Sequence, residues 1–148
     1  MLTSVVDQLE RCSDRTFSYA EMKFFKMWWQ RQSEARKKSV RKLIKAGQLN
    51  IVNGGLSAPD EATTSHDDLL DNFMSGHRFI KEELQSEEPT ISWQVDSFGE
   101  SRGYARLARD IGFDAMFYSR VDAKAKLENF EKKQKLGVWR PAEDNFGA

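Results

Sequence analysis

The order of the apolar segments constrains the fold of this 148-residue chain more than any other feature of its sequence. Segments rich in β-branched and aromatic residues predict strands, and apolar residues at helical spacing predict helices. One helix comes first, and a strand followed by a helix then recurs four times. This alternation is typical of an α/β protein with a parallel sheet and crossover helices. The expected strands are 16–21, 49–52, 91–96 and 113–120, and the expected helices are 2–9, 22–46, 66–84, 102–111 and 123–136.

The first helix has no strand before it. A crossover helix joins two strands of one sheet, so we expect the series to be cut at its N-terminal side. No linker, repeat or low-complexity segment divides the chain. We therefore expect residues 1–148 to be a continuous part of one domain.

Composition narrows the classes of partner. Lys and Arg total 23 and Asp and Glu total 23, which gives no electrostatic reason to expect a nucleic acid or an anionic membrane as partner. Apolar residues make up 39% of the chain, with ten Phe and four Trp, and argue against disorder. No apolar run has the roughly 18 residues of a membrane span, and the first residues lack the apolar core of a signal peptide. Cys12 is the only cysteine, so no intrachain disulfide can form.

Polar residues follow the predicted strands. In α/β sheets, ligands gather at the carboxyl ends of the strands, where this sequence places Glu21, Asn53–Gly55, Asp96 and Arg120. Asp96 ends an otherwise apolar strand, and such a carboxylate can act as a nucleophile, a metal ligand or a general base. It can equally cap the helix that begins near Ser101 or brace the turn. A structural ion pair is an equal alternative for Arg120.

Other chemically distinctive residues favour structural roles. Trp28 and Trp29 are more typical of packing than of a platform for sugar stacking. His66 begins a predicted helix and His77 lies on an apolar stripe, and no HxxxH or HxD pair accompanies either. The acid-rich segment 60–66 fits the start of a helix. Periodicity and spacing alone therefore predict an α/β chain with a polar cluster at one sheet edge.

Six sequence words, in their order and spacing, resemble glycoside hydrolase family 38, the retaining α-mannosidases, and most of all its lysosomal, acidic branch. They are FSYAEMKFFKMWWQRQ (17–32), GQLNIVNGG (47–55), PDEATTSH (59–66), WQVDSFGES (93–101), GFDAMFYSRVD (112–122) and VWR (138–140). The resemblance covers almost the whole chain. It implies that residues 1–148 are a partial N-terminal catalytic domain, truncated at both ends, from a β/α barrel-like fold.

The resemblance also assigns roles to single residues. Asp96 matches the family's catalytic nucleophile, a carboxylate that also binds zinc. Phe98 matches an aromatic residue beside the bound sugar, and Arg120 matches an arginine that contacts the nucleophile region. The DEA word at 60–62 matches a signature whose role in the family is largely structural.

The implied activity is that of a zinc-dependent retaining α-mannosidase, which hydrolyses terminal α-mannosides of oligosaccharides and N-glycans through a covalent glycosyl-enzyme. Asp96 would be one of four zinc ligands, and the other three ligands and the acid/base residue match no position of this chain. We therefore expect the 148 residues alone to be inactive. The resemblance implies a lysosomal or vacuolar location for the full-length protein.

Three positions depart from the family pattern: Leu56 replaces a Trp, Ser97 a Pro and Glu100 a His. Glu100 adds a negative charge close to Asp96 in sequence. These departures leave open a degenerate, non-catalytic α/β interaction domain derived from the family. A different carbohydrate-active α/β hydrolase is a further alternative, favoured if Asp96 is buried or lies far from Arg120.

Overall fold

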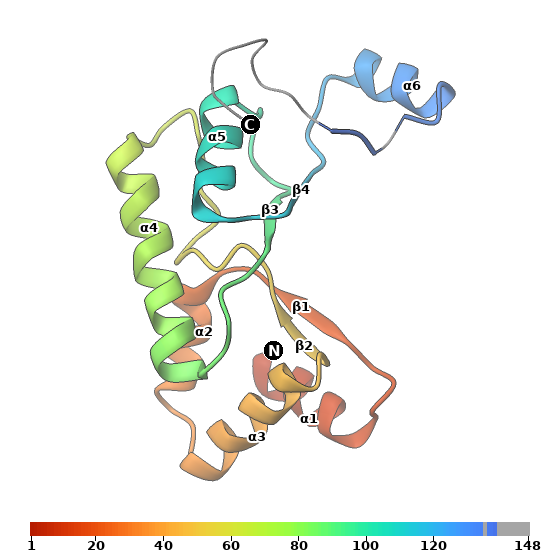
Figure 1. Ribbon diagram of the computed structural model, residues 1–148. Coiled ribbons are helices and arrows are strands. Elements are labelled where there is room, and N and C mark those ends of the chain that lie inside the picture. Colours follow the sequence, from red (N-terminus) through yellow and green to blue (C-terminus); the bar gives the residue numbers. More distant parts are fainter. Residues whose placement is uncertain (135, 139–148) are drawn as a thin grey trace.

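The computed structural model describes residues 1–134 and 136–138 and confirms the α/β class (Figure 1). The expected segments appear in the expected order. They are α1 (Leu2–Arg11), β1 (Phe17–Tyr19), α2 (Met22–Trp29), α3 (Glu34–Lys45), β2 (Leu49–Ile51), α4 (His66–Phe79), the π-helical turn η1 (Ile80–Leu84), β3 (Ile91–Gln94), α5 (Arg102–Ile111), β4 (Ala115–Tyr118) and α6 (Ala123–Glu131). Within this described part of the chain, no helix has the length and apolar character that crossing a membrane requires.

The strands form two parallel pairs, β1 with β2 and β3 with β4, instead of the single sheet predicted. Asn53 joins the pairs. Its backbone N–H donates to Ile91 O at 2.7 Å, and its side-chain Oδ1 accepts from the Trp93 N–H at 3.2 Å. The hydrogen bonds between the two pairs stop at Asn53, because this residue adopts a left-handed conformation, with φ 59°, which turns the chain away from an extended path. The four strands lie in chain order, and the barrel-like fold that the resemblance implies stays a prediction.

The single helix predicted over 22–46 is wrong, because the structure has two helices there. Ser33 starts the second one as an N-cap, with its hydroxyl accepting a hydrogen bond from the Arg36 N–H. The Gln32 amide donates to Trp28 O at 2.8 Å and closes the end of α2. The helix predicted over 123–136 ends at Glu131.

The larger core lies under β1 and β2, between α1, α2, α3, the last turn of α4 and η1. Trp29 is buried in it and Trp28 packs at its margin, so the prediction of packing roles is confirmed. Both indole N–H groups are satisfied, by Thr3 Oγ1 for Trp28 and by Glu83 Oε2 for Trp29. The buried members of this core are Leu2, Val6, Leu9, Met22, Phe25, Trp29, Val40, Leu43, Leu49, Phe79, Ile80 and Leu84.

A smaller core joins α4 and α5 to the second strand pair. Figure 1 shows α4 extending from the side of α5 to the side of α2. Phe73, Tyr104 and Ala108 are its buried members. Gly76 lets α4 approach the chain after β2, because a Cβ at this position would lie 1.9 Å from Gly54 O. His77 Nε2 donates one hydrogen bond to Asn53 O at 3.0 Å, as a core histidine does.

Candidate functional site

The site begins with the register of β3 and β4. Ile91 pairs with Ala115 and Gln94 with Tyr118, so residues 24 positions apart lie opposite each other. Continued two residues beyond the strand ends, this register places Asp96 opposite Arg120. Arg120 donates to Asp96 Oδ1 from Nε at 3.0 Å and from Nη2 at 2.5 Å. The pair lies at the carboxyl end of both strands, the edge where α/β sheets bind ligands.

Asp96 is open to solvent. Its side chain is 78% exposed and that of Arg120 is 49% exposed. An exposed ion pair contributes only about 0–1 kcal/mol to stability, so this contact orients the carboxylate more than it stabilises the fold. Ser101, not Asp96, caps α5, with its hydroxyl accepting from the Tyr104 N–H at 2.9 Å. The alternative role of Asp96 as the cap of that helix is therefore wrong.

Phe98 completes the cluster. Its ring is 79% exposed, and the guanidinium carbon of Arg120 lies 4.7 Å from the ring centre. This is the geometry of a cation–π contact. Arg120 thus joins the Asp96 carboxylate to an exposed aromatic face, and the structure brings together the three residues that the resemblance selected.

The loop after β3 is tied to the segment before α4. Pro59 O accepts two hydrogen bonds, from Gln94 Nε2 at 3.1 Å and from Ser97 Oγ at 3.3 Å. Both donor side chains are buried. Ser97, one of the departures from the family pattern, therefore supplies an anchor for the loop that a Pro side chain lacks.

Glu100 meets Glu61, a contact that the sequence analysis missed. Burial, a hydrogen bond with the Glu61 carboxyl and its negative charge raise the pKa of Glu100 to about 8. Glu61 Oε2 also accepts from the Ser101 N–H at 2.6 Å, so Glu61 helps to start α5. The sequence shows both partners, Glu61 in the DEA word and Glu100 as a replacement for His. Their spacing along the chain does not indicate that they meet.

An open hollow of about 650 Å³ lies beside Arg120. Glu100, Tyr118, Asp122, Leu136 and Val138 are among the residues that line it. Its volume falls within the range of small-molecule sites, roughly 300–1,000 Å³. The VWR word at 138–140 extends past Val138 to residues outside the described part of the chain.

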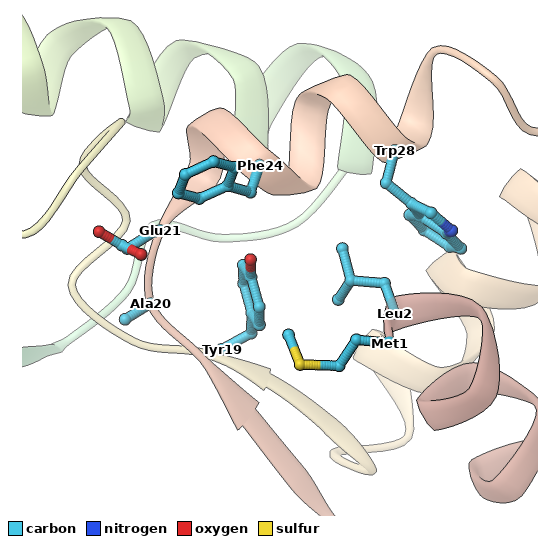
Figure 2. A pocket seen from close by; sticks show the side chains of 7 residues that line it. All are labelled: Met1, Leu2, Tyr19, Ala20, Glu21, Phe24 and Trp28. Atoms are coloured by element: carbon cyan, nitrogen blue, oxygen red, sulfur yellow. The ribbon is translucent and has the colours of Figure 1, made fainter.

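The other predicted polar residues lie elsewhere. Asn53 is fully buried at the junction of the strand pairs. Glu21 accepts from the Ala58 N–H at 3.2 Å and lines a separate, mainly apolar hollow of about 520 Å³. In Figure 2 the Tyr19 ring stands in this hollow between Phe24 of α2 and the first residues of α1. Of the four neighbourhoods predicted at strand ends, two therefore come together, those of Asp96 and Arg120.

Few of the described side chains could ligate a zinc ion at this site. In residues 1–134 and 136–138, no three or more His, Cys, Asp or Glu side chains gather into a metal site. Asp96 is an exposed carboxylate of the right chemistry for one ligand, whereas a zinc site takes three or four protein ligands. The described residues fit a single donor and not a complete zinc centre.

The geometry places the molecule among α/β proteins with parallel strands, and polar side chains gather at the carboxyl ends of two of these strands. Residues 1–145 match the sequence model of the glycosyl hydrolases family 38 N-terminal domain. The chain belongs to glycoside hydrolase family 38.

Curated relatives agree with this assignment. The chain is 41% identical over 141 residues to a probable alpha-mannosidase of Arabidopsis thaliana, a match that covers 95% of the chain. It is 40% identical over 150 residues to the alpha-mannosidase of Canavalia ensiformis, covering 100% of the chain. It is 38% identical over 144 residues to the lysosomal alpha-mannosidase of Mus musculus, covering 97% of the chain. The matches span 13, 15 and 14% of these relatives, respectively.

Proposed function

We propose that these residues form part of the catalytic domain of a retaining alpha-mannosidase, with Asp96 as its nucleophile. The observation that carries the proposal is the exposed Asp96 carboxylate, held by Arg120 at the carboxyl end of β3 and β4. Family membership supplies the reaction class. The substrate class is terminal α-mannosides of oligosaccharides and N-glycans, in line with relatives named alpha-mannosidases.

The contacts of Asp96 fit nucleophilic attack. Arg120 donates two hydrogen bonds to Oδ1, and Oδ2 accepts none from the described residues. In the first step a carboxylate oxygen of Asp96 forms a bond to the anomeric carbon while the glycosidic C–O bond breaks. The departing oxygen takes a proton from an acid outside the described residues. Water then gives a proton to the deprotonated acid and attacks the same carbon while the bond to Asp96 breaks, which returns the carboxylate and releases mannose with retained configuration.

Arg120 and Phe98 have distinct parts in this reaction. Arg120 holds the carboxylate in one orientation, so that less orientational freedom is lost on reaching the transition state. Phe98 offers an exposed ring face next to the nucleophile, and an aromatic face can pack against the apolar face of a sugar ring. Both side chains can act on the reaction because they lie beside Asp96 at the strand end.

We further propose that Asp96 gives one ligand to a zinc ion whose other ligands come from outside the described residues. A bound zinc ion there supplies charge stabilisation and orientation of sugar hydroxyls. We also propose a lysosomal or vacuolar location, by analogy with the relatives named lysosomal alpha-mannosidase in Mus musculus, Bos taurus and Dictyostelium discoideum.

The test is turnover of p-nitrophenyl α-mannoside by a protein of the relatives' length that carries these residues. Asp96→Asn is expected to lower kcat by at least about 10³-fold, because an amide cannot act as the nucleophile. Asp110→Asn is the matched control, since Asp110 also pairs with an arginine, Arg106, on an exposed surface. Its kcat is expected to stay within about twofold of the parent.

Two outcomes contradict the proposal. Full activity of Asp96→Asn removes Asp96 from the nucleophile's role. A folded parent protein without any turnover favours the alternative of a non-catalytic domain, which the three departures from the family pattern first raised.

A further inference from the structure

The loop that carries Asp96 is fastened to one segment of the chain, residues 59–61. Ser97 and Gln94 donate to Pro59 O at one end of the contact. At the other end, Ser101 N–H donates to Glu61 Oε2 and Glu100 meets the Glu61 carboxyl. Asp96 lies between Gln94 and Ser97 of the first attachment, Phe98 lies between Ser97 and Glu100, and both side chains are exposed. The position of both side chains therefore depends on whether the attachments hold.

The second attachment brings two carboxyl groups together out of water. Both oxygens of Glu100 and Oε1 of Glu61 are buried, and within the described residues none of the three has a conventional hydrogen-bond donor. Ionised carboxylates only accept hydrogen bonds, so two ionised groups here would repel each other and leave these oxygens unsatisfied. A single proton removes the conflict, because the protonated group donates to the other.

The charges around the pair do not replace that proton. Tyr104 of α5 lies near both glutamates, and burial together with their negative charge raises its pKa, so that its hydroxyl stays neutral. Arg120 and Asp122 line the same hollow as Glu100, but Arg120 binds Asp96 and Asp122 caps α6. Arg102 adds a positive charge on the first turn of α5. The influences on the Glu100 carboxyl itself are burial and Glu61.

We propose that Glu61 and Glu100 share one proton, and that this proton fastens the Asp96 loop to residues 59–61. The two glutamates are then positioning residues for the nucleophile. This role, unlike the shared proton itself, rests on the function proposed above. With the proton in place, the carboxyl–carboxyl hydrogen bond supports the bond from Ser101 N–H to Glu61. Loss of the proton puts two negative charges at the contact and loosens the loop.

The loop is expected to be fixed in acid and neutral solution and to loosen in alkaline solution. The direction follows from burial beside a like charge, which raises the pKa of Glu100 to about 8. A protonated His at this position, as in the family pattern, would form an ion pair of opposite charges with Glu61, so the conflict between two like charges would not arise. The device is therefore a consequence of Glu100 in this chain.

The first test is a carbon-13 and amide NMR titration of the 148-residue chain between pH 4 and 10. One glutamate carboxyl is expected to titrate near pH 8, and the Ser101 amide signal is expected to move with the same midpoint. Glu100→Gln keeps a donor toward Glu61 without the titrating proton, so both transitions are expected to vanish while the acid-form position of the Ser101 signal is kept. Glu87→Gln, an identical change at an exposed position, is expected to leave both transitions in place.

Absence of any glutamate transition above pH 6, or a Ser101 transition that survives in Glu100→Gln, overturns the proposal. Glu61→Gln gives the same information if Glu100→Gln fails to fold, because either amide removes the shared proton. A transition that moves on addition of Ca²⁺ also contradicts it, since a cation would then hold the pair together instead of a proton.

The second test separates this inference from the proposed function. In the longer, active protein, Glu100→Gln is expected to shift the alkaline limb of the kcat profile by at least one pH unit, with the acid limb unchanged. An unchanged profile overturns the positioning role. If the longer protein is active but the NMR transition is absent, the shared proton is overturned and the proposed function stands. If the transition is present but the longer protein shows no turnover, the proposed function is overturned and the shared proton stands.

Discussion

At the scale of single residues, Asp96 and Arg120 meet because of the register of two short strands. A parallel ladder keeps a constant offset, so the pairing of Gln94 with Tyr118 carries over to the residues just past the strand ends. Phe98 then covers the guanidinium from the loop. One side chain, Arg120, therefore sets both the orientation of the carboxylate and the position of the exposed ring.

Arg120→Lys is expected to lower kcat by about 10- to 100-fold in the longer protein. Lysine keeps the charge, but it has neither the two N–H donors that converge on Asp96 Oδ1 nor the planar group that stacks on Phe98. Steady-state kinetics with an α-mannoside measure the effect. Arg106→Lys, at another exposed arginine–carboxylate pair, is the control. Equal activities of the two variants would remove Arg120 from the site.

At the scale of helices and strands, patterns local in sequence were predictable and contacts distant in sequence were not. Apolar periodicity located α1 and α5, and Gly112 ended α5 in the left-handed conformation. The break before Ser33 was missed because one capping serine in a polar stretch gives a weak signal against a long helical pattern. The split of the sheet depends on the backbone of Asn53, and the Glu61–Glu100 contact depends on how α5 docks.

The candidate site divides in the same way. The strand-end rule alone selected Asp96 and Arg120, but it also selected Glu21 and Asn53, which lie elsewhere. Only the family resemblance distinguished the first pair from the second. Sequence reasoning found the residues with chemistry, whereas the register between strands decided which of them meet.

Gly76→Ala tests the packing of α4 against the chain after β2. The new methyl group would lie 1.9 Å from Gly54 O and 2.9 Å from Gly55 C, and backbone atoms cannot move aside as a side chain can. The expected loss of stability is at least about 2 kcal/mol, the scale of overpacking in a core. Chemical denaturation of the 148-residue chain measures it.

Gly103→Ala is the matched control on α5, where the nearest atom to a new Cβ is Ser101 Oγ at 3.6 Å. Alanine favours helix over glycine by about 0.5–1 kcal/mol, so this variant is expected to be as stable as the parent or slightly more stable. A neutral Gly76→Ala would mean that α4 does not approach the β2 end this closely.

At the scale of the whole molecule, the Glu61–Glu100 pair makes folding depend on pH. The pKa of Glu100 lies at 4.5 for the ordinary group and at about 8 in the folded chain. Between these values the folded chain keeps a proton that the unfolded chain has lost, so stability from this group is complete below pH 4.5 and falls as pH rises to about 8.

Glu100→Gln removes this dependence, and its free energy of unfolding is expected to exceed that of the parent increasingly from about pH 5 to pH 8. Above pH 8 the difference is expected to stay constant. Urea unfolding at a series of pH values gives the comparison. Asp68 and Glu34, whose pKa values hydrogen bonding lowers, act in the opposite direction but contribute equally to both proteins. A constant difference from pH 5 to 9 would contradict the shifted carboxyl.

The 148-residue chain by itself is expected to bind zinc weakly and to lack mannosidase activity. Asp96 offers one carboxylate, and no group of three or more potential ligands exists among residues 1–134 and 136–138. One carboxylate cannot offset the loss of hydration of the ion, because protein zinc sites use three or four ligands. Isothermal titration calorimetry is expected to give a Kd above about 100 μM, a binding free energy weaker than roughly −5.5 kcal/mol.

The Asp96→Asn variant of the same chain identifies the ligand in this titration. If the weak binding belongs to Asp96, the variant is expected to show less heat, whereas the Asp110→Asn control is expected to match the parent. Tight binding with one zinc ion per chain would instead require ligands that the described residues do not bring together. That result would contradict the proposal that Asp96 binds zinc together with ligands from outside the described residues. It would not contradict the contact between Asp96 and Arg120.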